Sequence, residues 1–174
     1  KSKLKKRPDL RGKDLERSRK ACEQLRDQPL TLLNFVEGTR FDPSKHSDQN
    51  SPFQYLLRPK SGGIHAVLQA LGDQLEAILD VTIIYPGFQS PGLSDLVFGR
   101  LRRIRVDVDQ LCIGEDGVPT LEQIRSREAG VHIRKWLNER WQRKEQLIKQ
   151  YLEEQGEQEF SEIMETQAAV PDPV

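Results

Sequence analysis

The chain has 174 residues and carries 27 basic and 27 acidic side chains, so its formal net charge is zero. This length allows one domain with a hydrophobic core and is short for two. No apolar run approaches the roughly 20 residues that span a bilayer, which excludes a membrane-spanning helix from this stretch of sequence. The two cysteines lie far apart in sequence with no partner at metal-ligand spacing, and nothing in the sequence indicates a disulfide framework, which favours a reducing, cytoplasm-facing location.

The charges are unevenly distributed along the chain. Residues 1–28 hold eleven Lys or Arg against five Asp or Glu, whereas residues 151–174 hold seven acidic residues and no basic one. A basic leading segment suits an anionic bilayer surface, and it equally suits a helix face in water. Nucleic acid is not expected as a partner, because the basic stretch has no interleaved aromatic residues. Since the chain opens on Lys1, we expect it to be part of a longer protein.

The first third of the chain is predicted to contain a helix, a strand and a loop. Asp14 to Asp27 has apolar residues at helical spacing and ends before Pro29. Thr31 to Val36 is β-prone and stops just before a glycine, which predicts a buried strand. From Asp42 to Pro52 the residue types are those of loops. We expect the hydrophobic core to lie between Leu30 and Leu111.

Helices and strands alternate in the middle of the chain. Ser61-Gly62-Gly63 opens a helix that carries Ile64, Val67, Leu68, Leu71 and Leu75 on one face. Asp80 to Tyr85 is dense in β-branched residues and predicts a second strand. Alternation within Asp95 to Leu111 predicts a half-buried strand near a sheet edge. Residues 114–117 are predicted to form a turn.

Val131 to Glu154 is predicted to be one long helix with a single apolar side. The order of elements predicts the α/β class, a layered domain with a mixed, partly parallel sheet flanked by helices, plus this long C-terminal helix. By this division residues 1–129 form the layered domain, residues 130–155 the long amphipathic helix, and residues 156–174 an acidic, disordered tail.

The predicted strand ends at Glu37-Gly38-Thr39-Arg40, and these residues suit an anionic ligand. Gly38 lets the backbone turn sharply, Thr39 offers a hydroxyl donor, and Arg40 offers a planar fork for two phosphate oxygens. Glu37 would repel a phosphate, so we expect it to hold Arg40 or a neighbouring backbone amide in place. The alternative is an ordinary surface ion pair between Glu37 and Arg40.

A second cationic block follows at the start of the next helix. Arg58-Pro59-Lys60-Ser61-Gly62-Gly63 places two cations and two glycines where the free amides and the dipole of a helix start also favour an anion. The sequence therefore predicts a phosphate site made of Glu37, Gly38, Thr39, Arg40 and Lys60. No metal site is predicted.

Three blocks of the chain, in this order and spacing, resemble the glycerolipid acyltransferases, the family of 1-acylglycerol-3-phosphate and other lysophospholipid acyltransferases. The blocks are Leu32 to Arg40, the helix start at Lys60, and the hydrophobic run Val81 to Pro86. Within the last block, Thr82 stands where family members commonly have proline. The resemblance covers Leu10 to Leu111, and the long extension between the first two blocks resembles a bacterial branch of the family.

The catalytic motif of that family, a histidine followed five positions later by an aspartate, does not occur in this sequence. Five positions after the three histidines, His46, His65 and His132, stand Ser51, Ala70 and Leu137. In the family the histidine removes the proton from the acceptor hydroxyl and the aspartate orients the ring, and the pair precedes Glu-Gly-Thr-Arg. The resemblance therefore implies a catalytic pair upstream of Lys1 and an isolated chain that is inactive.

The resemblance also implies what the intact protein does. It would transfer a fatty acyl group from acyl-CoA or acyl-carrier protein to the hydroxyl of a lysophospholipid such as 1-acylglycerol 3-phosphate, with no cofactor beyond this co-substrate. The implied location is the cytoplasmic face of the inner membrane, whose surface is reached through the intact protein. The alternative is a non-catalytic module that binds phospholipid headgroups or a protein partner.

Histidine and tryptophan positions leave further alternatives open. His65 either contacts phosphate or is a packing residue, and His46 is expected to be solvated. Trp136 and Trp141 lie in a basic segment with Arg134, Lys135, Arg140, Arg143 and Lys144. Such a helix either lies at a membrane interface or packs on the domain through its tryptophans with its charges in water.

Overall fold

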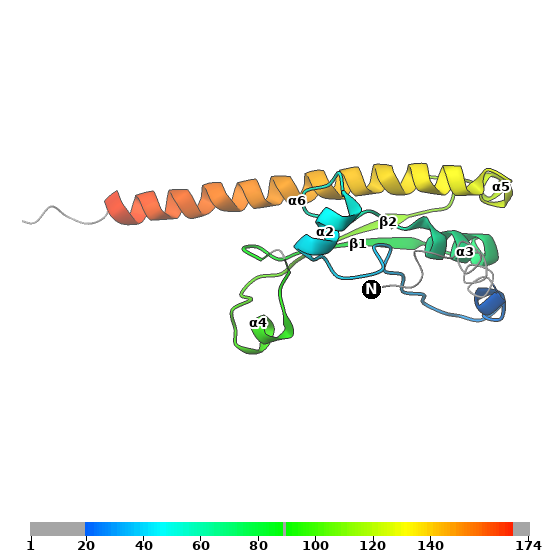
Figure 1. The fold of residues 1–174 in the computed structure, drawn as a ribbon, viewed down its shortest axis with the longest axis horizontal. Helices are drawn as coiled ribbons and strands as arrows, with labels where there is room; N and C mark the ends of the chain where they lie inside the picture. The colour runs from blue at the N-terminus through cyan, green and yellow to red at the C-terminus, as the bar shows by residue number, and fades with distance from the viewer. Residues whose placement is uncertain (1–19, 89, 169–174) are drawn as a thin grey trace, which may run out of the picture.

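The described part of the protein is a mixed α/β arrangement dominated by one long helix (Figure 1). The structure is a computed structural model that describes residues 20–88 and 90–168, with the backbone alone from residue 157 onward. Its elements, in chain order, are α2 (Pro43–Gln49), α3 (Ser61–Leu71), β1 (Ile78–Ile84), α4 (Leu93–Val97), β2 (Arg105–Leu111), α5 (Leu121–Arg125) and α6 (Ala129–Ala168). Within these described ranges, none of the helices is long and apolar enough to cross a membrane.

The strands β1 and β2 form an antiparallel ribbon, and α6 runs along one of its faces (Figure 1). Ile78 pairs with Leu111 and Ile84 pairs with Arg105. Both strands were predicted at these places. The predicted parallel pairing is not found, because the sheet in the described residues contains these two strands only, and they run in opposite directions.

The segment Thr31 to Val36 is not the predicted buried strand. It has no sheet partner among the described residues, and the side chains of Leu33 and Phe35 are largely exposed. A β-prone run becomes a strand only beside the free edge of another strand. Here the carbonyl of Val36 instead accepts a hydrogen bond from the amide of Lys60 at 2.9 Å. The segment therefore lies against the start of α3.

The alternation predicted for β2 is present, but the apolar residues lie on its exposed face and the acidic residues on its covered face, although a half-buried strand usually buries its apolar residues. Val106 and Val108 are each 53% exposed, whereas Asp107 and Asp109 are half-buried and lie on the face toward α6. The reason lies on α6, which presents cationic side chains to the ribbon. A helix with buried cations requires acidic partners on the strands that it covers.

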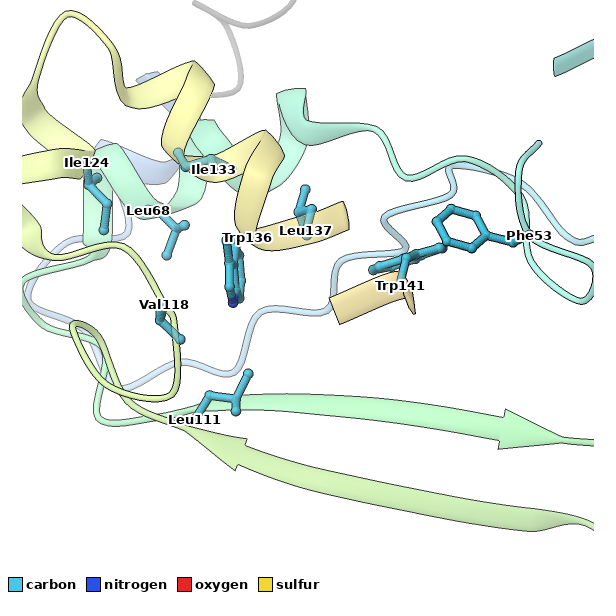
Figure 2. Close-up of a cluster of buried hydrophobic side chains, with 9 residues drawn as sticks. All are labelled: Phe53, Leu68, Leu111, Val118, Ile124, Ile133, Trp136, Leu137 and Trp141. Carbon is cyan, nitrogen blue, oxygen red and sulfur yellow. The ribbon is translucent and has the colours of Figure 1, made fainter. Parts of the chain in front are cut away.

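The main core lies beneath the first turns of α6 rather than ending at Leu111. Figure 2 shows Trp136 of α6 among side chains from α3, α5 and the end of β2. The buried residues of this cluster are Phe53, Leu68, Leu111, Val118, Ile124, Ile133, Trp136, Leu137 and Trp141. The predicted limit of the core at Leu111 is wrong, because α5 and α6 supply much of its apolar surface.

Several predicted boundaries also change. The helix α6 reaches Ala168, so the disordered tail expected from residue 156 is helical as far as the structure describes it, in line with its many Glu and Gln residues. Within Asp42 to Pro52, predicted to be a loop, α2 forms because Asp42 caps it and Pro43 occupies its first turn. Of the helix predicted from residue 14, residues 14–19 lie outside the described residues, and residues 20–23 are helical. The turn at residues 114–117 is confirmed.

Candidate anion-binding site

The loop that carries Glu-Gly-Thr-Arg is a tight turn centred on Gly38. The amide of Gly38 donates to the carbonyl of Phe35 at 2.8 Å, and Gly38 has a φ angle of +71°. Residues with a side chain rarely adopt this left-handed conformation, so glycine is the residue that permits the turn. The loop therefore brings its backbone close to the neighbouring helix start.

Lys60, which precedes α3, lies over Gly38. A Cβ atom added to Gly38 would stand 3.1 Å from the Nζ atom of Lys60 and 3.5 Å from its Cδ atom. The hydrogen bond from the Lys60 amide to the Val36 carbonyl also joins the backbone of Lys60 to the segment that leads into Gly38. Two predicted site residues, separated by more than twenty positions in sequence, are thus neighbours in space.

The start of α3 offers backbone amides that lack a capping side chain. Lys60 is the N-cap residue and forms no side-chain cap, and the first turn contains no acidic residue. Gly62 faces open space, whereas Gly63 lies against the side chain of Asn34. Uncapped amides at a helix start, together with the helix dipole, attract an anion. This helix start is therefore an anion-attracting feature beside Gly38.

Thr39 and Arg40 occupy different surroundings. The Thr39 hydroxyl accepts a hydrogen bond from Lys45 of α2 at 2.7 Å, so a third cation joins this corner of the molecule. Arg40 is exposed, and no ion pair joins it to Glu37 in the described residues, which removes the alternative of a simple Glu37–Arg40 surface pair. Lys45 was missed from the sequence. The sequence feature that could have indicated Lys45 is Asp42-Pro43, because these residues begin α2, the short helix that contains Lys45.

Glu37 has a structural role in this loop. Its Oε1 atom accepts a hydrogen bond from the amide of the fully buried Leu57 at 3.1 Å. Burial raises the pKa of the Glu37 carboxyl, while the Leu57 hydrogen bond and the nearby Trp141, Lys144 and Lys60 act to lower it. The Trp141 indole nitrogen lies close to Glu37, although the two do not meet hydrogen-bond geometry. Glu37 therefore holds a backbone amide, the second of the two roles expected for it.

A second carboxylate, Glu145 of α6, holds the same connecting segment further upstream. Its two oxygens accept hydrogen bonds from the amides of Gln54 at 2.6 Å and Tyr55 at 3.2 Å. Glu37 and Glu145 together fix the backbone that leads to Lys60. The sequence contained no local sign of this contact, because Gln54 and Glu145 are 91 positions apart.

The two histidines in this region are structural in character. The half-buried ring of His65 lies near Gly130, and burial lowers its pKa, with Arg134 adding to the effect. His46 is not simply solvated as expected, because its ring is hydrogen-bonded to the carbonyl of Phe53 and lies 5.6 Å from the ring of Phe41.

The tryptophans of α6 are core residues. Trp136 is 5% exposed and Trp141 7% exposed, so the membrane-interface alternative is wrong for these side chains. The expectation that the charges of this helix lie in water is also wrong for Arg140 and Lys144, which are buried.

This corner gathers cations and uncapped backbone amides, the groups that attract an anion. Over residues 20–88 and 90–168, no group of three or more His, Cys, Asp or Glu side chains could hold a metal ion. Gly38, Thr39, Lys45, Lys60 and the start of α3 are brought together, and Arg40 follows them on the exposed side of the loop. We call Gly38, Thr39, Arg40, Lys60 and the start of α3 the phosphate corner.

Comparison with known proteins points to one class, the acyltransferases of lysophospholipids. The chain is 29% identical over 138 residues to 1-acyl-sn-glycerol-3-phosphate acyltransferase gamma of Mus musculus, which covers 74% of this chain and 34% of that protein. It is 27% identical over 137 residues to lysocardiolipin acyltransferase 1 of Gallus gallus, covering 72% of this chain and 34% of the relative. It is 28% identical over 140 residues to 2-acyl-1-lysophosphatidylinositol acyltransferase of Saccharomyces cerevisiae, covering 71% and 33%.

These relatives confirm the family predicted from the three sequence blocks: the chain is related to the 1-acylglycerol-3-phosphate and lysophospholipid acyltransferases. The chain spans about a third of the length of the curated relatives it matches. No family model and no solved structure matches it.

Proposed function

We propose that the intact protein transfers a fatty acyl group from acyl-CoA or acyl-carrier protein to the hydroxyl of a lysophospholipid such as 1-acylglycerol 3-phosphate. In this proposal the phosphate corner binds the phosphate of the acceptor. The observation that carries it is the position of Lys60 over Gly38, at the uncapped start of α3. Neither Lys60 nor Arg40 forms an ion pair with a carboxylate in the described residues, and Glu37 interacts with Lys60 only through their charges at a distance, so both cations can contact a ligand.

The expected affinity for phosphate follows from the hydrogen-bond donors at this site. Hydrogen bonds to a charged group contribute about 1.5–3 kcal/mol each. Lys60 provides a mobile ammonium, Arg40 a planar fork, and the start of α3 backbone amides. Glu37 would repel the phosphate, but its carboxylate is turned to Leu57, where it positions the backbone.

The acyl transfer itself needs a base to remove the proton from the acceptor hydroxyl. This sequence has no histidine followed five positions later by an aspartate, so we place the catalytic pair in a part of the whole protein beyond this sequence. General-base assistance contributes typically about 10²–10⁴-fold. The chain alone is therefore expected to bind acceptor and to turn over little. We further propose that the intact protein acts at the cytoplasmic face of the inner membrane, in a bacterial branch of the family.

Calorimetric titration of the chain tests the proposed phosphate contact. A short-chain 1-acylglycerol 3-phosphate, kept below its micelle concentration, should bind saturably, whereas the matching 1-acylglycerol without phosphate should not. Lys60→Ala and Arg40→Ala should each weaken binding about tenfold or more, the loss of one charged hydrogen bond. Lys135→Ala is the control, since Lys135 is a largely exposed cation of α6. Equal binding of both ligands, or equal losses in all three variants, would contradict the proposal.

A second candidate, a headgroup-binding module without catalysis, is favoured by the missing histidine and aspartate pair. The two candidates share the phosphate corner and differ in turnover. Release of coenzyme A by the whole protein, in the presence of acyl-CoA and 1-acylglycerol 3-phosphate, separates them. Acceptor-dependent release supports the transferase, and tight acceptor binding without release supports the module.

A further inference from the structure

The connection between β1 and β2 is far longer than the geometry of the two strands requires. Antiparallel neighbours can be joined by two residues, yet residues 85–104 separate Ile84 from Arg105. Figure 1 shows that the part of this connection around α4 stands away from α6 and the ribbon. Long connections in compact domains are commonly functional.

The tip of this connection exposes large apolar side chains. Leu93 is 73% exposed, Leu96 54%, Val97 70% and Phe98 74%, and α4 contains no buried residue. These side chains therefore contribute nothing to the core of the described structure. A contiguous group of exposed apolar residues at a protruding tip marks a contact surface.

Cations follow this apolar tip directly in the chain. Arg100 and Arg102 are exposed, and Arg103 lies beside them in sequence. The carboxylate of this segment, Asp95, is already bound: it forms an ion pair with Arg100 at 2.9 Å and accepts a hydrogen bond from the amide of Gly92 at 2.7 Å. An apolar tip bordered by arginines matches a bilayer surface, where acyl chains lie beneath anionic headgroups.

The base of the same connection lies next to the phosphate corner. The hydroxyl of Ser90 donates to the carbonyl of Phe41 at 2.9 Å, and Phe41 directly follows Arg40. A tip held in a bilayer would therefore keep the phosphate corner near the headgroup layer.

We propose that α4 and the arginines after it form a shallow anchor in an anionic lipid surface. Leu93, Leu96, Val97 and Phe98 enter the boundary between headgroups and acyl chains, Arg102 contacts lipid phosphates, and Arg100, already paired with Asp95, borders the apolar tip. Arg100 also lies 5.7 Å from the ring centre of Phe98, so the cation and the apolar tip are adjacent. This inference does not depend on acyl transfer, because the anchor requires no reaction.

Co-sedimentation of the 174-residue chain with lipid vesicles tests the anchor. Vesicles of phosphatidylcholine with about one third phosphatidylglycerol provide the anionic surface, and pure phosphatidylcholine provides the neutral one. The wild-type chain should bind the anionic vesicles preferentially. The double variant Leu96→Asp with Phe98→Asp should lose at least tenfold of its vesicle affinity, and Arg102→Glu should lose affinity for anionic vesicles only.

Two exposed apolar residues elsewhere serve as controls. Val131→Asp, at the start of α6, and Ile83→Asp, on the open face of β1, are expected to retain vesicle binding. Because α4 has no buried residue, the double variant should keep the unfolding midpoint of the wild type. It should also still bind the short-chain 1-acylglycerol 3-phosphate, which separates a failed anchor from a failed phosphate corner. Failure of the wild type to bind anionic vesicles, unchanged binding of the double variant, or loss of binding only in Ile83→Asp would overturn the proposal.

Discussion

Two groups of cations in this molecule differ in whether acidic partners neutralise them. On the buried side of the ribbon, Arg140 and Lys144 of α6 both contact Asp80, at 2.7 Å in each case. At the phosphate corner, Lys60 and Arg40 are exposed, and no carboxylate pairs with them in the described part of the chain. The comparison teaches which positive charges stabilise the fold and which remain available to a ligand.

The buried group is satisfied almost completely by contacts within the protein. Besides its ion pair, Lys144 donates to the carbonyl of Val81 at 2.9 Å and to the hydroxyl of Thr82 at 2.8 Å. Arg140 also contacts Asp109. An added anion would find no free donor on Lys144, and the one guanidinium nitrogen of Arg140 that lacks a partner, Nη1, is buried, so this group should not bind phosphate even though it carries two cations.

The largest expected effect is therefore the loss of a buried cation. Arg140→Ala leaves Asp109 without its cation and Asp80 with Lys144 alone, and removal of one member of a largely buried group of ion pairs costs about 3 kcal/mol. Urea denaturation should show this loss in the free energy of unfolding. Lys135→Ala, on the exposed side of the same helix, should change that free energy by less than about 0.5 kcal/mol. A small loss in Arg140→Ala would show that the buried group is not structural.

Next in size is the loss of the hydrogen bond at Glu37. Glu37→Ala leaves the buried amide of Leu57 without its acceptor, at a cost of about 2 kcal/mol. Glu37→Gln keeps an acceptor oxygen and removes a charge that burial disfavours, so it should be near the wild type in stability. Thermal or urea unfolding of both variants measures the difference. If the two variants lose the same stability, the charge and not the hydrogen bond is what Glu37 contributes.

A smaller effect is expected from filling the space under Lys60. Gly38→Ala places a side chain on a residue with positive φ, which costs about 1 kcal/mol, and moves the Lys60 ammonium away from its position. Both stability and affinity for 1-acylglycerol 3-phosphate should fall. The matched control is Gly117→Ala, because Gly117 has a similar φ angle of +80° and a Cβ atom there meets nothing within 4 Å. If the two variants bind 1-acylglycerol 3-phosphate with equal affinity, Gly38 is not part of the ligand site.

The smallest effect concerns pH. The Arg140 hydrogen bond lowers the pKa of Asp109 below its ordinary value, with Arg143 and Lys144 adding to the effect. A lowered acid pKa stabilises the fold above the unfolded pKa, and this contribution is lost as the pH falls below about 4. Glu37, whose pKa is raised by burial, acts in the opposite sense. The acid-induced loss of stability should thus be shallower in Asp109→Asn than in the wild type, and an identical pH profile would contradict the assignment.

The same comparison shows which features the sequence could predict. The helix start at Ser61, the strand at β1 and the residues of Glu-Gly-Thr-Arg follow from local spacing and turn chemistry. The burial of Arg140 could not be predicted, because its partners Asp80 and Asp109 stand 60 and 31 positions away.

The fate of Thr31 to Val36 could not be predicted either. Its residues favour a strand, but strand formation depends on a neighbouring edge that local sequence does not specify. The contact between Gly38 and Lys60 was predicted as a shared site from their residue types, whereas Lys45 required knowing that Asp42 and Pro43 begin a helix.

The most direct test of the central claim follows backbone amide signals by NMR during titration with a short-chain 1-acylglycerol 3-phosphate. The claim predicts saturable shifts at Gly38, Gly62 and Gly63, which are absent with the phosphate-free 1-acylglycerol and much weaker in Lys60→Ala. Shifts that cluster instead around Arg140 and Lys144, or that occur equally with both ligands, would contradict it.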